Sequence, residues 1–259
     1  DSGGQGDCGM VPRCVCFFFF VFGWPRASIL ERFCDVLAVG GHIENNAPAS
    51  EAITQIPLSK LLSNLPFIAI IVATFANNWS LLVFLSFLPK FVDNELGVDL
   101  SSGSFLVLII IPSIVSVIAL NLGGYIADTL IKKGYKVIKV RKSANSIGFF
   151  GSAACLFTIP FLNDVYTIIG LICMTNIFIG AAAGGFGVNH ADLGPKSTGT
   201  LVGIASTLGT AAGVLGNIVS GIVLDLTQSW TLVFFIAAGL LVFGGIFYLL
   251  FASDKKQFD

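Results

Sequence analysis

Charge and histidine are scarce in this sequence. Only 11% of its 259 residues are charged and two are histidines, whereas 55% are hydrophobic. A soluble domain usually carries about 25% charged residues, so we expect lipid to be the solvent for most of the chain. The formal net charge of −1 gives no reason to expect a nucleic-acid partner.

Charge is missing altogether from six long stretches. Between residues 66 and 252, every Asp, Glu, Lys and Arg falls in one of five short intervals. The stretches between them have about the length of the ~20 helical residues that cross a bilayer core. Buried helices of large soluble proteins can also be apolar all round, but six in succession favour a membrane. The sequence predicts an all-α membrane protein with six transmembrane helices at 66–89, 103–127, 143–162, 165–188, 198–224 and 230–252.

The charged intervals differ in sign, and this predicts the orientation. Residues 128–142 include six basic residues and one acid, whereas residues 90–102 include three acids and one lysine. Basic residues near the ends of spans stay in the cytoplasm. We therefore expect the 128–142 interval and both ends of the six-span block to be cytoplasmic.

The first 55 residues differ from the rest in composition. Their apolar run at 14–24 is too short to span a bilayer. It fits either a signal peptide or the remnant of a preceding membrane helix, and residues 42–55 are typical of a polar cytoplasmic linker. We expect two parts, an amino-terminal segment with a linker at 1–55 and a six-span bundle at 56–259.

Residues typical of catalytic and metal sites are poorly represented. No pair among the six cysteines and two histidines has the spacing of a structural zinc site. No carboxylate pair lies within a predicted span, where acid–base chemistry would need one. We expect no enzyme activity, no metal site and no cofactor.

Uncharged polar residues within the spans are candidates for binding a solute. Such residues are costly in lipid and therefore invite a functional explanation, although they can equally hydrogen-bond a neighbouring helix. The candidate substrate-binding residues are Asn77, Asn78, Asn121, Asn176, Ser206 and Thr207. No predicted span contains an ionisable residue, so the charge that holds an anion would have to come from elsewhere.

Glycines recur four residues apart in the fourth and fifth spans. The pairs are Gly180 and Gly184, Gly199 and Gly203, and Gly209 and Gly213. This spacing puts a smooth strip on one helix face, against which a second backbone can pack closely. Glycine-rich spans also bend, as a carrier requires.

Two polar motifs lie at the ends of spans. Gly124 and Asp128 precede Lys132 and Lys133, so a carboxylate at a helix end comes just before a basic cluster. Such an acid can pair with the basic loop or with a neighbouring helix end, and hold one conformation. In the second motif, Asn-His-Ala-Asp-Leu-Gly-Pro at 189–195, we expect a tight turn between two spans that contains Asn189, His190, Asp192 and Pro195.

These motifs resemble those of the major facilitator superfamily. Residues 124–133 are similar to its loop motif in the second-half copy, and residues 189–195 resemble the Asn-His-x-Asp-Ile-x-Pro signature of the anion/cation symporter family. That family includes sialin, vesicular glutamate transporters and plant phosphate transporters. Asn78-Trp79, Val140-Arg141-Lys142 and Gly203-Ile204 match in register. The resemblance implies one half of a facilitator fold, helices 7–12, built as two inverted three-helix repeats, with the amino-terminal six-helix bundle absent.

The resemblance also implies a function. The expected protein is a secondary active transporter that carries a small organic or inorganic anion, with phosphate first, by alternating access coupled to sodium or protons. Its partners would be the anion, the coupling ion, membrane lipid and the missing bundle. The alternative is an inert half-carrier remnant. The family tends to have Thr and Tyr where this chain has Ser80 and Leu81, and a Ser-Asn pair where it has Ala205 and Ser206. Both changes remove polar groups, which leaves the substrate open.

Overall fold

The computed structural model describes residues 60–258 except 62, 97–103 and 163. The chain divides into two compact units, Asp1–Ser50 and Glu51–Asp259. The first unit lies outside the described residues, as do the apolar run at 14–24 and the boundary expected at residue 55.

The described part of the second unit is helical, without strands. Six of its stretches are long and apolar enough to cross a membrane, which confirms the all-α, six-span prediction. Its elements are α4 (Leu65–Leu96), α5 (Ser104–Lys132), α6 (Val137–Thr158), the 3-10 helix η1 (Ile159–Phe161), α7 (Val165–Ala182), the π-helix η2 (Ala183–Gly187), α8 (Val188–Leu193), α9 (Thr198–Thr227) and α10 (Trp230–Phe251).

Several helices are longer than the uncharged stretches that predict them. α5 continues to Lys132 and α6 begins at Val137, so most of the charged interval at 128–142 is helical rather than loop. Gly134 closes the short turn between these helices with a φ of 91°, a conformation that suits glycine. The absence of charged residues indicates which part of a helix lies in lipid. The backbone hydrogen bonds of the helix continue beyond that part.

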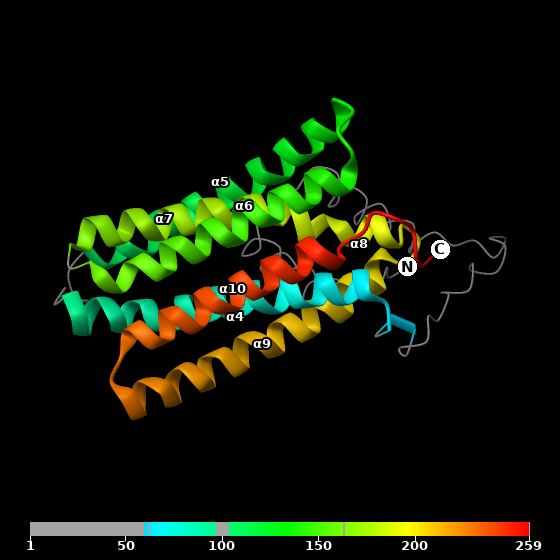
Figure 1. Ribbon diagram of the computed structural model, residues 1–259. Coiled ribbons are helices and arrows are strands. Elements are labelled where there is room, and N and C mark those ends of the chain that lie inside the picture. The colour runs from blue at the N-terminus through cyan, green and yellow to red at the C-terminus, as the bar shows by residue number, and fades with distance from the viewer. Residues whose placement is uncertain (1–59, 62, 97–103, 163, 259) are drawn as a thin grey trace, which may run out of the picture. The chain divides into compact units, whose positions relative to one another are not determined.

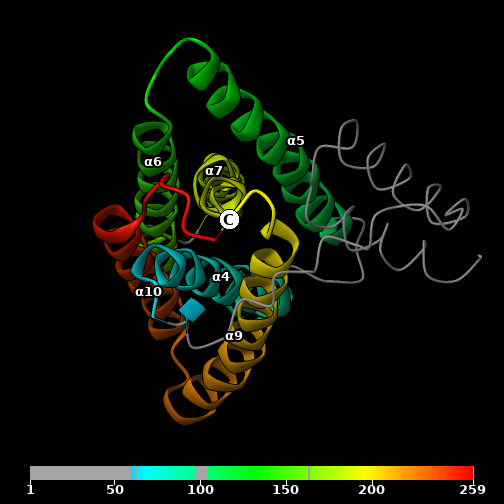
Figure 2. The same ribbon diagram turned by 90° about the vertical axis from the view of Figure 1, so that its right-hand side faces the viewer.

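The six spans pack in an order that repeats. The most extensive contacts join α5 to α7, α7 to α6, α6 to α10, α10 to α4, and α4 to α9. Exchanging α4 with α7, α5 with α9 and α6 with α10 reproduces the same set of contacts. Because successive spans alternate in direction, α7 runs opposite to α4, and the two three-helix repeats are inverted as expected. Figure 2, a view along the bundle, shows α4 and α7 in the middle with α6 and α10 to one side.

Glycines allow the closest of these contacts. A Cβ atom added at Gly123 or Gly180 would overlap the backbone of the other helix in the α5–α7 pair, and one at Gly213 would overlap Leu82 of α4. By contrast, a Cβ at Gly199 or Gly203 would meet no other described residue within 4 Å. The close-packing prediction is therefore confirmed for the pairs beginning at 180 and 209, whereas the pair at 199 makes no close contact in the described part of the chain.

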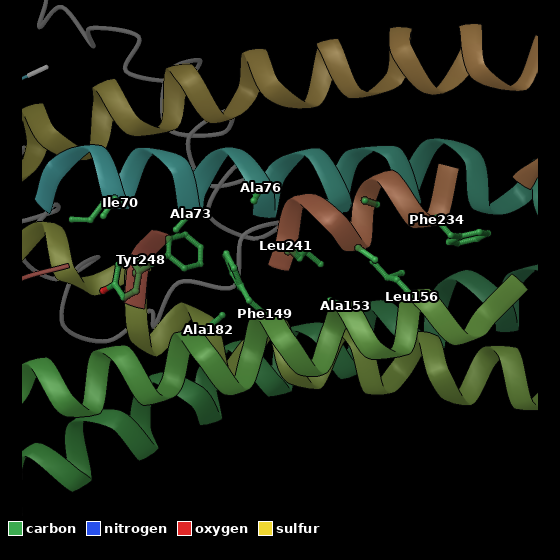
Figure 3. Close-up of a cluster of buried hydrophobic side chains, with 14 of the residues drawn as sticks. Ile70, Ala73, Ala76, Phe149, Ala153, Leu156, Ala182, Phe234, Leu241 and Tyr248 are labelled. Atoms are coloured by element: carbon green, nitrogen blue, oxygen red, sulfur yellow. The ribbon is translucent and has the colours of Figure 1, made fainter. Parts of the chain in front are cut away.

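The apolar core lies between α4, α6, α7 and α10. Phe149 of α6 is fully buried there, and its ring centroid lies 5.7 Å from that of Phe186 in η2. Figure 3 shows Phe149 between Ala76 of α4 and Ala182 of α7, with Leu241 of α10 beside it. This core joins the two repeats and fixes the elements that hold the polar residues described next.

Most of the described basic residues lie at one end of the bundle, with Lys90 near the other end. Hydrogen bonds at the basic end join the start of α4, the start of α6, the turn after α8 and the residues after α10. Lysines in or next to these segments are Lys60, Lys136, Lys196 and Lys255. Asp164 and Asp225 lie at the other ends of their spans. This separation agrees with the predicted alternation, and the assignment of the basic end to the cytoplasm stays a prediction.

Candidate functional site

A buried ion pair joins α6 to α8 near the basic end. Arg141 Nε donates to Asp192 Oδ2 at 3.0 Å, and Arg141 Nη1 donates to the carbonyl oxygen of Gly184 at 2.9 Å. The Arg141 side chain is 5% exposed and that of Asp192 is 21% exposed. α6 begins six residues before the predicted span, so Arg141 lies within this helix but outside the uncharged stretch at 143–162.

The π-helix η2 lies directly against α6 beside this pair. A Cβ atom at Gly185 would lie 2.7 Å from the carbonyl oxygen of Arg141 and 2.8 Å from the backbone nitrogen of Asn145. Only glycine fits so near another backbone. Single π-turns within α-helices are frequent at functional sites, and here the π-turn brings the Gly184 carbonyl to the guanidinium.

The signature residues 189–193 form a helix, which corrects the expected tight turn. Asn189, His190 and Asp192 belong to α8, and the chain turns only afterwards, at residues 194–197. Asn189 and His190 are buried, whereas Pro195 is exposed. The helical stretch through α7, η2 and α8 therefore reaches five residues beyond the predicted end of the span at 188.

Polar atoms without partners surround the ion pair. Among the described residues, these buried atoms are both side-chain polar atoms of Asn145 and Asn189, Nε2 of His190 and the hydroxyl of Tyr248. His190 Nδ1 lies 3.3 Å from the Gly187 carbonyl oxygen. Tyr248 and Asn189 are adjacent, but no hydrogen bond of normal geometry joins them. Native interiors leave few such groups unpaired, so this cluster differs from ordinary packing.

The charged residues of the predicted motif at the end of α5 are exposed. Asp128 lies in the penultimate turn of α5, and Lys132 and Lys133 follow at its end, all three exposed. Within the described part of the chain Asp128 forms no ion pair. A Cβ atom at Gly124 would meet no atom of the described residues within 4 Å. The pairing with the basic loop is not formed, and contact with a neighbouring helix end stays a prediction.

The six candidate substrate-binding residues lie on four helices. Asn77 is half-buried on α4, and its Oδ1 has no partner among the described residues. Asn176 is half-buried on α7, and its Nδ2 donates to the Ile172 carbonyl at 3.0 Å. Both lie in the fourth turn of their helices, which are equivalent in the two repeats. The structure thus places two amides at equivalent positions, counted from opposite ends of the bundle.

The other four candidates differ in exposure. Asn78 is buried against α9, where its Nδ2 would clash with a Cβ atom at Gly209. Ser206 is half-buried on α9. Asn121 of α5 and Thr207 of α9 are exposed, and each donates to the carbonyl four residues before it. Asn78 therefore packs between helices, whereas Asn121 and Thr207 lie on open faces.

A comparison with family models identifies the chain. The model described as Major Facilitator Superfamily matches residues 14–216, which is most of the chain. The chain belongs to the major facilitator superfamily. The match includes part of the segment before the bundle, which lies outside the described residues.

Curated relatives of this facilitator are transporters by name. It is 34% identical over 215 residues to the chloroplastic ascorbate transporter of Arabidopsis thaliana, covering 81% of this chain and 38% of that protein. It is 32% identical over 222 residues to the chloroplastic sodium-dependent phosphate transport protein 1 of the same plant, covering 84% and 42%. It is 32% identical over 207 residues to human sialin, covering 78% and 41%. These relatives bear out the resemblance to the anion/cation symporter family. The chain spans about two fifths of their length.

The sequence of this facilitator does not point to two residues of the buried cluster. Arg141 falls in the charged interval that predicts a loop, and Tyr248 lies in an apolar span outside any motif. One signal is the spacing, because Arg141, Asn145 and Phe149 recur every four residues. This spacing places them on one helix face, and the polar residues at the first two positions indicate that this face points away from lipid. The structure buries all three.

Proposed function

We propose that this bundle is one half of a secondary active transporter for a small anion. It would work by alternating access against a second six-helix bundle, with sodium or protons as the coupling ion. Membership of the facilitator superfamily and the names of the curated relatives support a transporter. No covalent chemistry is required of the chain.

The observation that carries this proposal is the open order of the helices. α5 and α9 end the packing series, and they form no extensive contact with each other among the described residues. A closed bundle would join them. The polar residues on this side are half-buried or exposed, as a surface that meets solute and a second bundle requires. In facilitators built from inverted repeats, the solute site lies near mid-membrane between such surfaces.

The amides at equivalent positions are the proposed solute ligands of this half. Asn77 and Asn176 can donate to and accept from a bound anion without adding charge. The one buried Lys or Arg among the described residues is Arg141, and its donors serve Asp192 and Gly184. The cation that holds the anion would therefore come from the second bundle.

Phosphate is the first substrate to test, followed by organic anions. One relative is named for phosphate and another for ascorbate. The test is uptake by the full-length gene product in liposomes, with phosphate, ascorbate, glutamate and sialic acid under imposed sodium or proton gradients. Accumulation of at least one anion that depends on a gradient is expected. Its failure in all combinations would refute the proposal.

A matched pair of threonines tests the proposed face. Thr207 and Thr158 are both exposed, and the hydroxyl of each donates to the carbonyl four residues before it, at 2.8 Å. Thr207 lies on α9 and Thr158 on α6. Thr207→Val should lower uptake several-fold, whereas Thr158→Val should leave it unchanged. Equal effects would show that the α9 surface is not the site.

An inert half-carrier is the second candidate. It is favoured by the chain's coverage of only 38–42% of the relatives' length, because half a pathway has one wall. Under this alternative, the isolated chain in liposomes would show no uptake while the longer gene product transports. Uptake by the isolated chain would exclude it.

A further inference from the structure

The residues after α10 return across the basic end of the bundle. We call residues 253–258 the carboxy-terminal strap. Asp254 Oδ2 accepts a hydrogen bond from the Ile138 backbone nitrogen at the start of α6, at 3.3 Å. Gln257 Oε1 accepts from Asn64 Nδ2, just before α4, at 3.0 Å. The segment that follows α10 of the second repeat is therefore tied to two elements of the first repeat (Figure 1).

Phe258 anchors the strap. Its side chain is 6% exposed, and its ring packs edge to face on Phe67 of α4 with 6.0 Å between centroids. Its carbonyl oxygen accepts a hydrogen bond from Ser197 Oγ at 3.1 Å. A Cβ atom at Gly194 would lie only 3.1 Å from the Cβ of Phe258. The strap thus fits closely against the turn between α8 and α9.

The strap also supplies hydrogen bonds that the end of α8 lacks. The last carbonyls of a helix have no partners within it, and a left-handed residue often closes the helix and satisfies them. Gly194 follows α8 with φ −153° and ψ 79°, which is not that conformation. Instead, the Leu193 carbonyl accepts from the backbone nitrogens of Gln257, at 2.7 Å, and Phe258, at 3.3 Å. Leu193 itself is fully buried.

We propose that the carboxy-terminal strap positions the α8–α9 turn, with Phe258 as the positioning residue. α8 carries Asn189, His190 and Asp192, so the strap holds the end of the segment that faces Arg141. When the strap is released, Leu193 loses two donors and the turn loses its packing partner. This inference depends on contacts within the bundle and is independent of the proposed transport function.

Hydrogen–deuterium exchange on the full chain in lipid nanodiscs tests the proposal. The amides of Gly194 and Ser197 bond to the carbonyls of His190 and Gly194 at 3.2 and 3.0 Å, so both report on the turn. Phe258→Ala should speed exchange of both at least tenfold. The Gln228 amide, at the opposite end of α9, bonds to Leu224 at 2.9 Å and should be unchanged.

Three further variants separate positioning from general destabilisation. Phe258→Leu keeps an apolar anchor and should restore most of the protection. Lys255→Ala changes an exposed side chain of the strap and should have no effect. Ser197→Ala removes one hydrogen bond without creating a cavity, so it tests the proposal even if Phe258→Ala fails to fold. It should speed exchange of the Gly194 amide several-fold. The proposal would be overturned if Phe258→Ala or Ser197→Ala sped exchange at residues 257 and 258 and left that of the turn amides, Gly194 and Ser197, unchanged.

Discussion

Breaking the buried pair between Arg141 and Asp192 tests the structure most directly. Asp192→Ala removes the carboxylate and leaves a guanidinium whose side chain is 5% exposed, with the Gly184 carbonyl as its remaining partner. Arg141→Met removes the cation and leaves a carboxylate that is 21% exposed. Because water reaches the Asp192 carboxylate more easily than the Arg141 guanidinium, the two single variants should lower the free energy of unfolding by different amounts.

The expected magnitudes follow from burial. Removing one partner of a buried pair costs about 3–5 kcal/mol, and Asp192→Ala should fall in this range. Arg141→Met should cost about 1–3 kcal/mol, since the remaining carboxylate is partly hydrated and Gly184 loses one donor. The double variant with Arg141→Met and Asp192→Ala replaces both charges by apolar groups, which is often close to neutral. It should cost less than Asp192→Ala alone, with a coupling energy of at least about 2 kcal/mol.

Unfolding in mixed detergent micelles measures these free energies. Trp79 and Trp230 are buried at 8% and 9% exposure, so their fluorescence reports on the bundle, and Trp24→Phe in every variant removes the remaining tryptophan. The midpoints of SDS titrations then give the three differences. If the losses of the two single variants simply add in the double variant, Arg141 and Asp192 are not coupled and the reasoning fails.

Two other predictions concern packing and a helix cap. Gly180→Ala drives a Cβ atom into the Ala119 backbone of α5 and should lower the free energy of unfolding by about 1–3 kcal/mol. The control Gly203→Ala, where the described residues leave open space, should be neutral or stabilise by up to about 1 kcal/mol. Equal SDS titration midpoints for the two variants would contradict the close contact at Gly180. The Thr167 hydroxyl and backbone N–H donate to Asp164 and hold the pKa of its carboxyl below the ordinary range. The cap therefore stabilises the start of α7 at any pH above the pKa of the carboxyl in the unfolded chain, and it is lost as pH falls through the lowered pKa of the folded protein. Exchange of the Thr167 amide, corrected for its intrinsic rate, should therefore rise in acid. Asp164→Ala should abolish that rise.

The number and type of the helices could be predicted because lipid imposes a simple rule. A long stretch without charged residues can be recognised in a single sequence, and each of the six predicted stretches corresponds to a helix that is long and apolar enough to cross a membrane. The helix ends could not be read in the same way. A rule based on charge assigns Lys139, Arg141 and Lys142 to a loop. They belong to α6, because the helix continues where lipid ends.

The candidate site was less predictable, since it depends on pairing between distant segments. Nothing in the local sequence states that Arg141 meets Asp192, 51 positions later. The polar residues of the spans were all visible, but their burial was not. Asn77 and Asn78 are neighbours in sequence, yet helix geometry sends Asn78 against α9 and leaves Asn77 half-buried.

The π-turn at Ala183–Gly187 sets the rotational phase of everything that follows it. A π-turn holds one residue more than an α-turn, and each α-helical residue advances the chain by about 100°. If residues 183–187 formed a regular α-helix with the sequence unchanged, α8 would be rotated by roughly that angle. Asp192 would then turn away from Arg141, and the buried faces of Asn189 and His190 would turn outward. The wider turn therefore decides which side of α8 faces the interior.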